Sequence, residues 1–215
     1  MKFPFLSGKM NDYFEVGYLD GCLLREAAIV LIQLMLPTFS TSRLIIRPFL
    51  PEDSNDIFRL NGNRKVMQFL PRDEVFGSQA EASHFLESYI RKSEELAFVR
   101  QAVIRRSDGK WLGWCGLREQ KDGEVDLGFR FHESEWGNGY ATESGLAWLE
   151  YGFNEGQLSE IVANAAVGNV GSQKVLAKLG FLRHEREDHT EDGFRWLRYR
   201  INKNRYQKES VSQTM

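Results

Sequence analysis

Apolar and polar residues alternate along several segments after residue 41, which is the pattern of half-buried β-strands. Asp-Gly pairs end in Gly109 and Gly123, and glycine supplies the positive φ that a tight hairpin turn needs. The pattern therefore predicts an antiparallel meander in which these pairs are the turns. The expected strands are Arg43-Leu-Ile-Ile-Arg47, 98–105, 111–118 and 124–131.

Downstream of residue 131 helical periodicity appears, and strands alternate with helices. Upstream, Glu81 stands three residues after Ser78, a capping-box spacing that predicts a helix start. A meander followed by βαβ crossovers implies an α/β fold built on one mixed sheet. The expected helices are 51–61, the one after Ser78, 140–151 and 170–179, and the later strands are 160–166, 181–186 and 195–201.

This pattern divides the chain into an N-terminal extension at 1–40, one domain at 41–202 and a polar tail at 203–215. The extension is irregular and aromatic-rich, and its apolar run at 27–36 is too short to cross a membrane. It is consistent with an appended helix, a membrane-touching segment or an extension from a misassigned start codon. The membrane-touching segment is the least favoured of the three.

The amino-acid composition mainly excludes classes of function. The 215 residues carry a net charge of −2, which gives no support for non-specific nucleic-acid binding. The two cysteines, Cys22 and Cys115, lie far apart, so a disulfide framework is not expected and a reducing cytoplasm fits best. The four histidines have no metal-ligand spacing. We expect no metal, no nucleic acid and no membrane partner, in a monomer or a homodimer.

The most informative segment is Trp136-Gly-Asn-Gly-Tyr-Ala-Thr-Glu143, between a predicted strand and a predicted helix. Its glycines allow a tight curl whose N–H groups, with the helix N-terminus, suit a pyrophosphate. A plain helix-entry turn is the alternative. A dinucleotide-binding loop is disfavoured because Thr142 replaces the third glycine of that fingerprint, and because Glu160 opens the next strand instead of closing it.

The second downstream helix has a structural interpretation of its own. Asn169 is a good N-cap residue, and Gly180 suits a left-handed C-terminal closure. Phe181 can then contact Leu176 in a Schellman motif. For Asn169 two roles stay open, a cap alone or a cap that also binds a coenzyme.

Two ordered motifs make the chain resemble the GNAT superfamily of N-acetyltransferases, in the branch of the ribosomal-protein N-terminal acetyltransferases. Gly139 and Ala141 match the family's Gln/Arg-x-x-Gly-x-Gly/Ala loop, and Trp136 stands in place of the leading Gln or Arg. The second motif is Asn169-Val-Gly-Ser172 followed by Lys178-Leu-Gly-Phe181. The resemblance covers about three-quarters of the chain and leaves residues 1–40 unexplained.

The resemblance implies acetyl-CoA as co-substrate and a GNAT-like fold. It implies that a β-bulge splays the strand ending at Phe131 from strand 160–166, which leaves a V-shaped gap. The pantetheine arm would lie in that gap and pair with the backbone of Phe129 and Phe131. The other expected coenzyme contacts are Trp136, Gly137, Asn138, Gly139, Tyr140, Ala141, Thr142, Asn169 and Lys178.

Acetyl transfer to an amine needs a base for the amine and a proton for the leaving thiolate. Asp126 is our candidate base; the alternative is an exposed strand carboxylate. Glu143 is a rival whose position in a first helical turn favours a capping or dipole role. Related enzymes often use a Tyr as the acid, but Leu176 holds that position here, and the resemblance gives the role to Ser172.

The expected function is therefore acetyl-CoA-dependent N-acetylation of a primary amine, on a protein N-terminus or a small molecule. The acetyl group would pass by direct attack in a ternary complex. A non-catalytic acyl-CoA-binding regulator is the alternative. The acceptor is not encoded in any motif that we recognise.

Overall fold

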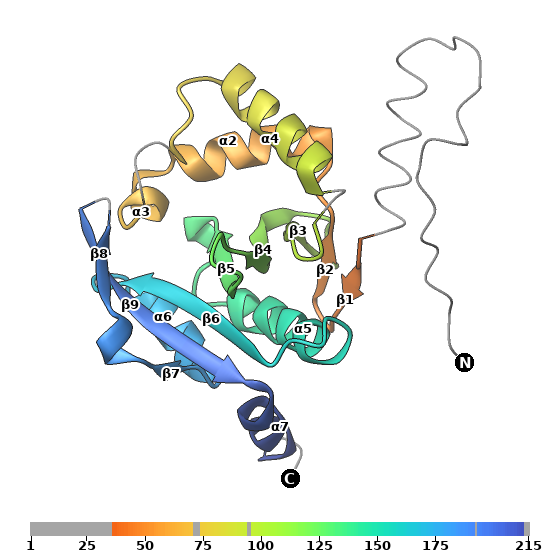
Figure 1. Cartoon of the computed structure of the whole chain (residues 1–215). Helices are drawn as coiled ribbons and strands as arrows, with labels where there is room; N and C mark the ends of the chain where they lie inside the picture. Colours follow the sequence, from red (N-terminus) through yellow and green to blue (C-terminus); the bar gives the residue numbers. More distant parts are fainter. Residues whose placement is uncertain (1–35, 71–73, 94–95, 192, 213–215) are drawn as a thin grey trace, which may run out of the picture.

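The computed structural model describes residues 36–70, 74–93, 96–191 and 193–212 (Figure 1). Within them one mixed sheet of nine strands has the order β1-β2-β3-β4-β5-β6-β9-β7, and β8 pairs with β9. The strands are β1 (Phe39–Ser40), β2 (Leu44–Arg47), β3 (Arg100–Arg105), β4 (Trp111–Glu119), β5 (Val125–Phe131), β6 (Glu160–Ala166), β7 (Leu182–Arg183), β8 (His189–Glu191) and β9 (Phe194–Asn202). The helices are α2 (Ser54–Gly62), α3 (Arg64–Met67), α4 (Gln79–Ser93), α5 (Tyr140–Asn154), α6 (Val170–Lys178) and α7 (Lys203–Ser212), with short 3₁₀ turns η1 (Pro51–Asp53), η3 (Glu133–Glu135) and η4 (Glu185–Glu187).

The predicted meander is confirmed. Strands β2 to β5 pair antiparallel in chain order. Gly109 and Gly123 have φ values of 69° and 84°, so each Asp-Gly turn takes the left-handed conformation that glycine permits.

The predicted crossovers are also present. Helix α5 joins the parallel strands β5 and β6, and α6 joins β6 to β7. Strands β6 and β7 both run antiparallel to β9, so β9 lies between two strands that are parallel to each other.

The sheet opens between β5 and β6. These strands are paired at Asp126 and Val162 alone among the described residues, although β5 continues to Phe131 and β6 to Ala166. In Figure 1 the β6 and β9 ribbons run at a clear angle to β4 and β5. The expected V-shaped gap is therefore present.

The β-bulge expected in the strand that ends at Phe131 is not found in the described β4–β5 register. The register of β5 against β4 is continuous from Val125 to Phe131, so no β-bulge shifts it. The register shift that the structure has lies between β3 and β4, at Val103/Ile104.

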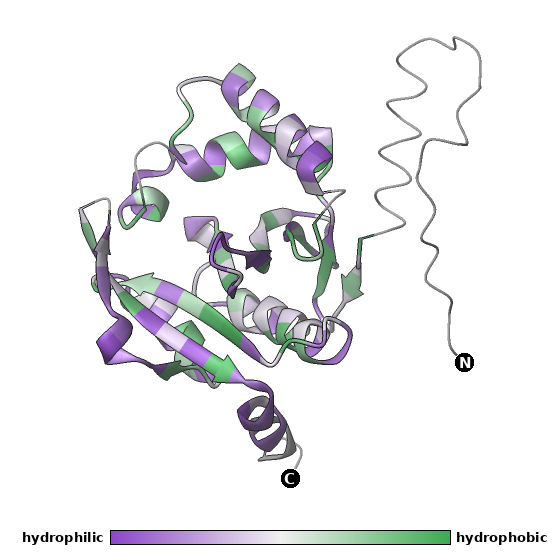
Figure 2. Ribbon diagram, viewed as in Figure 1, coloured by the Kyte–Doolittle hydropathy of each residue, from purple (hydrophilic) through white to green (hydrophobic). Residues whose placement is uncertain are grey.

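Helices cover both faces of the sheet. Trp148, Leu149 and Phe153 of α5 are buried against one face, and α6 packs on the same side. On the other face, Ile57 and Leu60 of α2 join a second buried cluster with α4. Figure 2 shows green and purple residues alternating along α2, as expected for a helix with one buried face.

Three elements differ from the sequence expectation. The strand predicted at 181–186 is only Leu182–Arg183, because the charged segment after it forms η4. Residues Phe39–Ser40 form β1 and pair with β2, although they fell within the predicted extension. The tail begins as helix α7, which is hydrophilic in Figure 2. Most of the extension, 1–35, lies outside the described residues, and with it most of the apolar run at 27–36.

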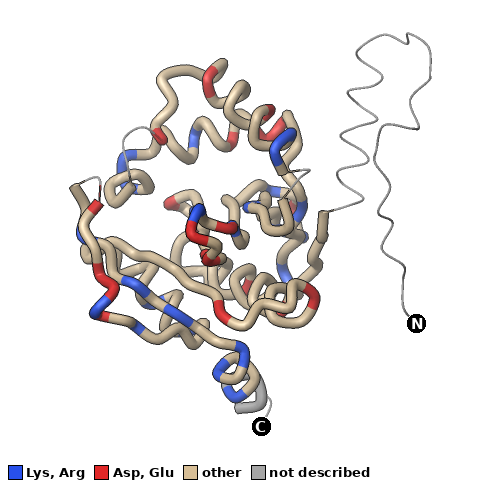
Figure 3. The backbone as a smooth tube through the Cα atoms, viewed as in Figure 1, with Lys and Arg blue, Asp and Glu red and all other residues tan. Residues whose placement is uncertain are grey.

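The C-terminal basic residues are largely paired. Figure 3 shows Lys and Arg along β9 and α7. Arg198 pairs with Glu124, and Arg200 pairs with Glu160 at 2.5 Å and Glu187 at 2.6 Å. These ion pairs compensate the positive charges of Arg198 and Arg200 on β9.

Candidate active site

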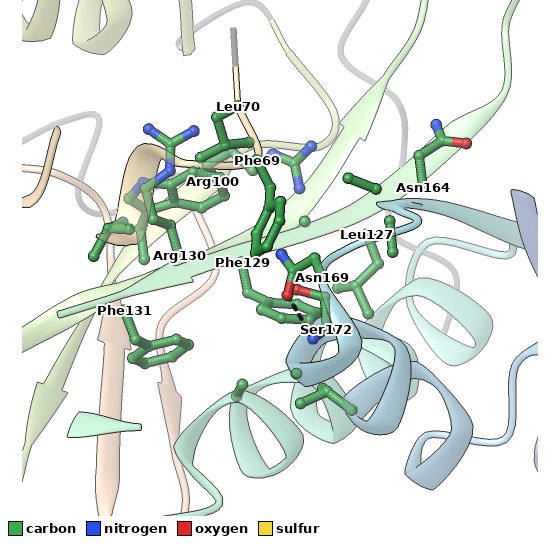
Figure 4. A pocket seen from close by; sticks show the side chains of 18 of the residues that line it. Phe69, Leu70, Arg100, Leu127, Phe129, Arg130, Phe131, Asn164, Asn169 and Ser172 are labelled. Carbon is green, nitrogen blue, oxygen red and sulfur yellow. Dashed lines mark hydrogen bonds between the residues drawn. The ribbon is translucent and has the colours of Figure 1, made fainter. Parts of the chain in front are cut away.

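A cavity of about 1100 Å³ lies along the opening between β5 and β6. One end is formed by the loop at 136–142 and the start of α6, and the other by α2, α3, α4 and the polar face of β3, β4 and β5. Figure 4 shows Phe129, Asn169 and Ser172 near one another, with Arg100 and Arg130 in the same pocket. The gap therefore joins two chambers into one continuous space.

The glycine loop adopts the curl that its residues predict. Gly137 and Gly139 have φ values of 79° and 81°, a conformation that residues with a Cβ rarely adopt. Gly139 is the N-cap residue of α5, so the first N–H groups of that helix have no acceptor within the helix. A Cβ added at Gly137 would meet nothing within 4 Å, which shows open space there. The loop thus has the form of an anion site.

An ion pair between Arg43 and Glu143 supports the glycine loop. The Glu143 carboxylate accepts hydrogen bonds from Thr41 Oγ1 at 2.5 Å and Ser42 Oγ at 3.1 Å. It also accepts from the Arg43 backbone N–H at 2.9 Å and Nε at 2.6 Å. Arg43 Nη1 in turn donates to the Asn138 carbonyl at 2.9 Å.

The same bonds give Glu143 a structural role. They tie its carboxylate to the chain before β2, which fits its position in the first turn of α5. Asn138 does not line the cavity, and its carbonyl faces Arg43. Sequence reasoning missed Arg43 because it stands 100 positions before Glu143, and no local motif connects them.

Trp136 closes one side of the loop. Its indole N–H donates to the Phe131 carbonyl at 2.9 Å, and the side chain is half exposed. The Phe131 carbonyl that was expected to pair with pantetheine therefore already has one partner. A carbonyl oxygen has two lone pairs, so it can accept a second bond. The side chain of Phe131 is buried in the core on the α5 side, and that of Phe129 packs against the same core.

The first turn of α6 forms the opposite wall of the gap. Asn169 is its N-cap, and its side chain accepts the Ser172 N–H at 3.0 Å. Ser172, Lys174 and Lys178 line the cavity, and both lysines are exposed. The positive end of the helix and the two exposed lysines thus face the same space.

The closure of α6 matches its prediction. Gly180 has a φ of 85° and donates to the Ala177 carbonyl at 3.1 Å. Phe181 N–H donates to the Leu176 carbonyl at 3.0 Å, which completes a Schellman motif.

Asp126 lies where β5 and β6 part. Its Oδ2 accepts from Arg100 Nη2 at 2.6 Å, and its Oδ1 accepts from Gln120 Nε2. Arg118 Nε lies 3.7 Å from Oδ1. The side chain is 12% exposed, so the alternative of an exposed strand carboxylate is wrong. The hydrogen bonds from Arg100 and Gln120 therefore compensate the burial of this carboxylate.

Two glycines make room for Arg100. Its Nη1 donates to the Gly116 carbonyl at 2.8 Å, and a Cβ on Gly128 would overlap the guanidinium. Arg100 is itself buried, and its Cζ lies 5.3 Å from the centroid of the Trp114 ring. The residues that position Asp126 therefore come from three strands.

A second buried arginine, Arg130, also lies against the Trp114 ring. Arg130 Cζ is 5.1 Å from the ring centroid, Nη1 donates to Asn61 Oδ1 at 2.8 Å, and Nη2 pairs with Glu74. Burial lowers the pKa of Arg130, although Glu74 acts in the opposite direction. Arg130 Nε has no hydrogen-bond partner among the described residues.

Every predicted site residue except Asn138 thus lines the cavity. Sequence reasoning missed Arg43, Arg100, Arg118 and Arg130. The register could have flagged one of them, since Arg118 is the cross-strand partner of Asp126 in the predicted hairpin.

The sequence predicts no metal site, no membrane span and no disulfide framework. Among the described residues, no group of three or more His, Cys, Asp or Glu side chains could hold a metal ion. None of the helices in that part of the chain is long and apolar enough to span a bilayer. Cys115 is a buried free thiol, and burial raises its pKa to about 11.

Comparison with known proteins gives a family match. The family model described as an acetyltransferase (GNAT) domain matches residues 43–182. The Bacillus subtilis protein YoaA, named as an uncharacterized N-acetyltransferase, is 28% identical over 149 residues, which are 68% of this chain and 84% of YoaA.

Solved structures show the same fold. A GNAT-family acetyltransferase from Bacillus anthracis matches with a TM-score of 0.67 and 22% identity, over 78% of this chain and 99% of its own. A spermidine N-acetyltransferase from Vibrio cholerae, solved with CoA and spermine, matches with a TM-score of 0.63 and 20% identity, over 78% and 99%.

Proposed function

The chain belongs to the GNAT acetyltransferase family, and from that premise we propose that it transfers the acetyl group of acetyl-CoA to a primary amine. The observation that carries the proposal is the single cavity that joins the glycine loop to the polar face of β3, β4 and β5 through the opening beside Asp126. Such a passage lets two substrates meet while each is held by a different part of the fold. Direct attack in a ternary complex is the mechanism that this geometry supports.

The loop and α6 fit the coenzyme. The N–H groups at the start of α5 would hold the pyrophosphate, with Gly137 and Gly139 giving close access. The backbone of β5 at Phe129 and Phe131 would pair with the pantetheine arm, and Lys178 would meet a phosphate. Acetyl-CoA bound there would supply a thioester whose carbonyl a backbone N–H can polarise.

We propose Asp126 as the base, acting directly or through a water. Its position where β5 and β6 part supports this role. Its carboxylate is also held by Arg100, so the amine or a water would have to reach it beside that ion pair. A base for an α-amine, with a pKa near 8, needs only modest strength.

We propose Ser172 as the group that protonates the leaving thiolate. Its place in the first turn of α6, on the cavity wall opposite β5, supports this assignment. The ribosomal-protein branch remains an interpretation of loop residues 136–143 and does not fix the acceptor.

The test is CoA release, followed with a thiol reagent, in the presence of acetyl-CoA and a panel of primary amines. With an accepted amine, Asp126→Asn should lower kcat/KM on the order of 10²–10⁴-fold at neutral pH. The loss should shrink as the pH approaches the amine's own pKa. Ser172→Ala should lower kcat while the affinity for acetyl-CoA is kept.

Glu119→Gln is the matched control, because Glu119 is an exposed carboxylate at the end of β4 outside the cavity lining. It should leave kcat/KM unchanged. A loss below threefold for Asp126→Asn would exclude Asp126 as the base.

A non-catalytic acyl-CoA-binding regulator would also keep Asp126 paired with Arg100. That second candidate predicts saturable acetyl-CoA binding with no CoA release above the rate without amine. If no amine in the panel is acetylated while acetyl-CoA binds, the regulator replaces the enzyme.

A further inference from the structure

Three arginines line the acceptor half of the cavity, on one face of neighbouring strands. Arg100 comes from β3, Arg118 from β4 and Arg130 from β5. Among the described residues, the carboxylates that pair with these arginines are Asp126 and Glu74. Three guanidinium groups therefore share two carboxylates.

Two of the arginines already form close ion pairs with carboxylates. Arg100 forms a 2.6 Å ion pair with Asp126, and both side chains are almost fully buried. Arg130 pairs with Glu74 and donates to Asn61. Each of these carboxylates is thus matched by one guanidinium.

Arg118 is the cation that remains. Its side chain is 53% exposed, and its contact with Asp126 is 3.7 Å from Nε to Oδ1, beyond a good hydrogen bond. The Asp126 charge is already held by the shorter contact with Arg100. The planar end of Arg118 is thus open to the cavity, in a form suited to bidentate binding of a carboxylate.

The position of Arg118 ties it to the reacting group. Arg118 and Asp126 are direct cross-strand partners in the β4–β5 register. An amine held beside Asp126 would place a substituent a few bonds away against Arg118. Tyr89 of α4, whose hydroxyl accepts the Arg100 N–H at 2.7 Å, lines the same chamber and adds apolar ring surface instead of charge.

We propose that the acceptor amine carries a carboxylate, and that Arg118 binds it. This inference rests on the proposed amine acetylation and names its substrate class. A polyamine is disfavoured, because a second ammonium group beside Asp126 would face Arg118 as a like charge. In this respect the acceptor differs from the spermine that accompanies the Vibrio cholerae enzyme in its structure.

The test compares each carboxylate acceptor with its neutral amide and with an amine that lacks the carboxylate. One set is L-phenylalanine, L-phenylalaninamide and 2-phenylethylamine; the other is 4-aminobutanoate, 4-aminobutanamide and 1,4-diaminobutane. CoA release is measured for each, and kcat/KM is expressed per concentration of unprotonated amine. In at least one set the carboxylate should exceed its amide by about five- to tenfold, a ratio expected of a charge-assisted bond in a half-exposed site.

Arg118→Gln should bring that ratio close to one, and Arg118→Lys should keep part of it. Arg91→Gln is the control, since Arg91 is an exposed arginine on α4 outside the cavity lining, and it should preserve the ratio. Added salt should also reduce the ratio in the unaltered protein, because Arg118 is half exposed. A ratio of one or less in both sets, or a ratio that survives Arg118→Gln, would overturn the inference.

A binding measurement separates this inference from the proposed activity. The same carboxylates and amides are titrated calorimetrically into the CoA-bound protein and into its Arg118→Gln variant. Arg118-dependent binding of carboxylates without acetylation would keep the inference and remove the activity. Acetylation of the diamine or the phenylethylamine, without preference for carboxylates, would keep the activity and overturn the inference. If the carboxylates neither bind nor react, the inference is also overturned.

Discussion

Glu143→Gln tests whether the ion pair behind the glycine loop positions the coenzyme. Glutamine keeps the size of the side chain but removes its charge, and an amide nitrogen cannot accept hydrogen bonds. At least one of the two bonds from Arg43, at 2.9 Å and 2.6 Å, must then be lost or weakened. Arg43 also donates to the Asn138 carbonyl, so the disturbance reaches the loop itself.

The magnitude follows from the exposure of the two partners. The Glu143 side chain is 15% exposed, and that of Arg43 is 48% exposed. A hydrogen bond to a charged group contributes about 1.5–3 kcal/mol when desolvated, and the exposure of Arg43 places the loss at the lower end. We expect the free energy of unfolding to fall by about 1.5–2 kcal/mol. Acetyl-CoA affinity should fall about three- to tenfold, because the loop loses its fixed curvature.

The same carboxylate gives a pH dependence. Burial acts to raise the pKa of Glu143, but hydrogen bonds from Thr41, Arg43 and Ser42 outweigh it, and the net pKa is lowered. A lowered folded-state pKa stabilises the fold above the unfolded pKa, and this stabilisation is lost as the pH falls through the folded value. The stability difference between the native protein and Glu143→Gln should therefore be complete at pH 7 and shrink below about pH 4.5.

The assay is urea unfolding followed by tryptophan fluorescence, with acetyl-CoA affinity measured by calorimetry. Glu150→Gln is the control, because Glu150 is an exposed carboxylate on the same helix α5. It should change neither quantity. Full stability and unchanged acetyl-CoA affinity in Glu143→Gln would refute the positioning role.

Three further substitutions test other parts of the fold. Gly139→Val should weaken acetyl-CoA binding tenfold or more in a folded protein, because φ at this position is 81° and a branched side chain would stand where the ligand approaches the backbone; unchanged affinity by calorimetry would move the pyrophosphate elsewhere. Gly180→Ala should lower the unfolding free energy by about 1–2 kcal/mol through left-handed strain at the end of α6, measured by urea unfolding; no change would mean that the closure relaxes without cost. Phe39→Ala should lower the free energy of unfolding by about 2 kcal/mol, since the ring lies 4.9 Å from that of Trp148 and 5.4 Å from that of Tyr151 between centroids. Removal of residues 1–35, in contrast, should leave acetyl-CoA binding intact. A truncated chain that cannot bind would place an essential part of the site before residue 36.

Local chemistry in the sequence determined much of this protein. Asp-Gly pairs fix the hairpin turns at Gly109 and Gly123, and Asn169, Gly180 and Phe181 fix both ends of α6. Each of these signals acts over a few residues, so neighbours in the chain suffice to read it. The glycine loop belongs to the same class, because its conformation depends on residues that lack a Cβ.

Tertiary structure decided what surrounds the reacting groups. Asp126 is visible in the sequence as a strand carboxylate, but its burial and its pairing with Arg100 arise only when β3, β4 and β5 align. The Arg43–Glu143 pair likewise joins residues 100 positions apart. Long-range ion pairs leave no periodic trace in a sequence, because charged residues occupy solvated faces and buried clusters with the same local pattern. For that reason the glycine loop could be predicted from the sequence, whereas the charges that would select the acceptor emerged from the packing of the sheet.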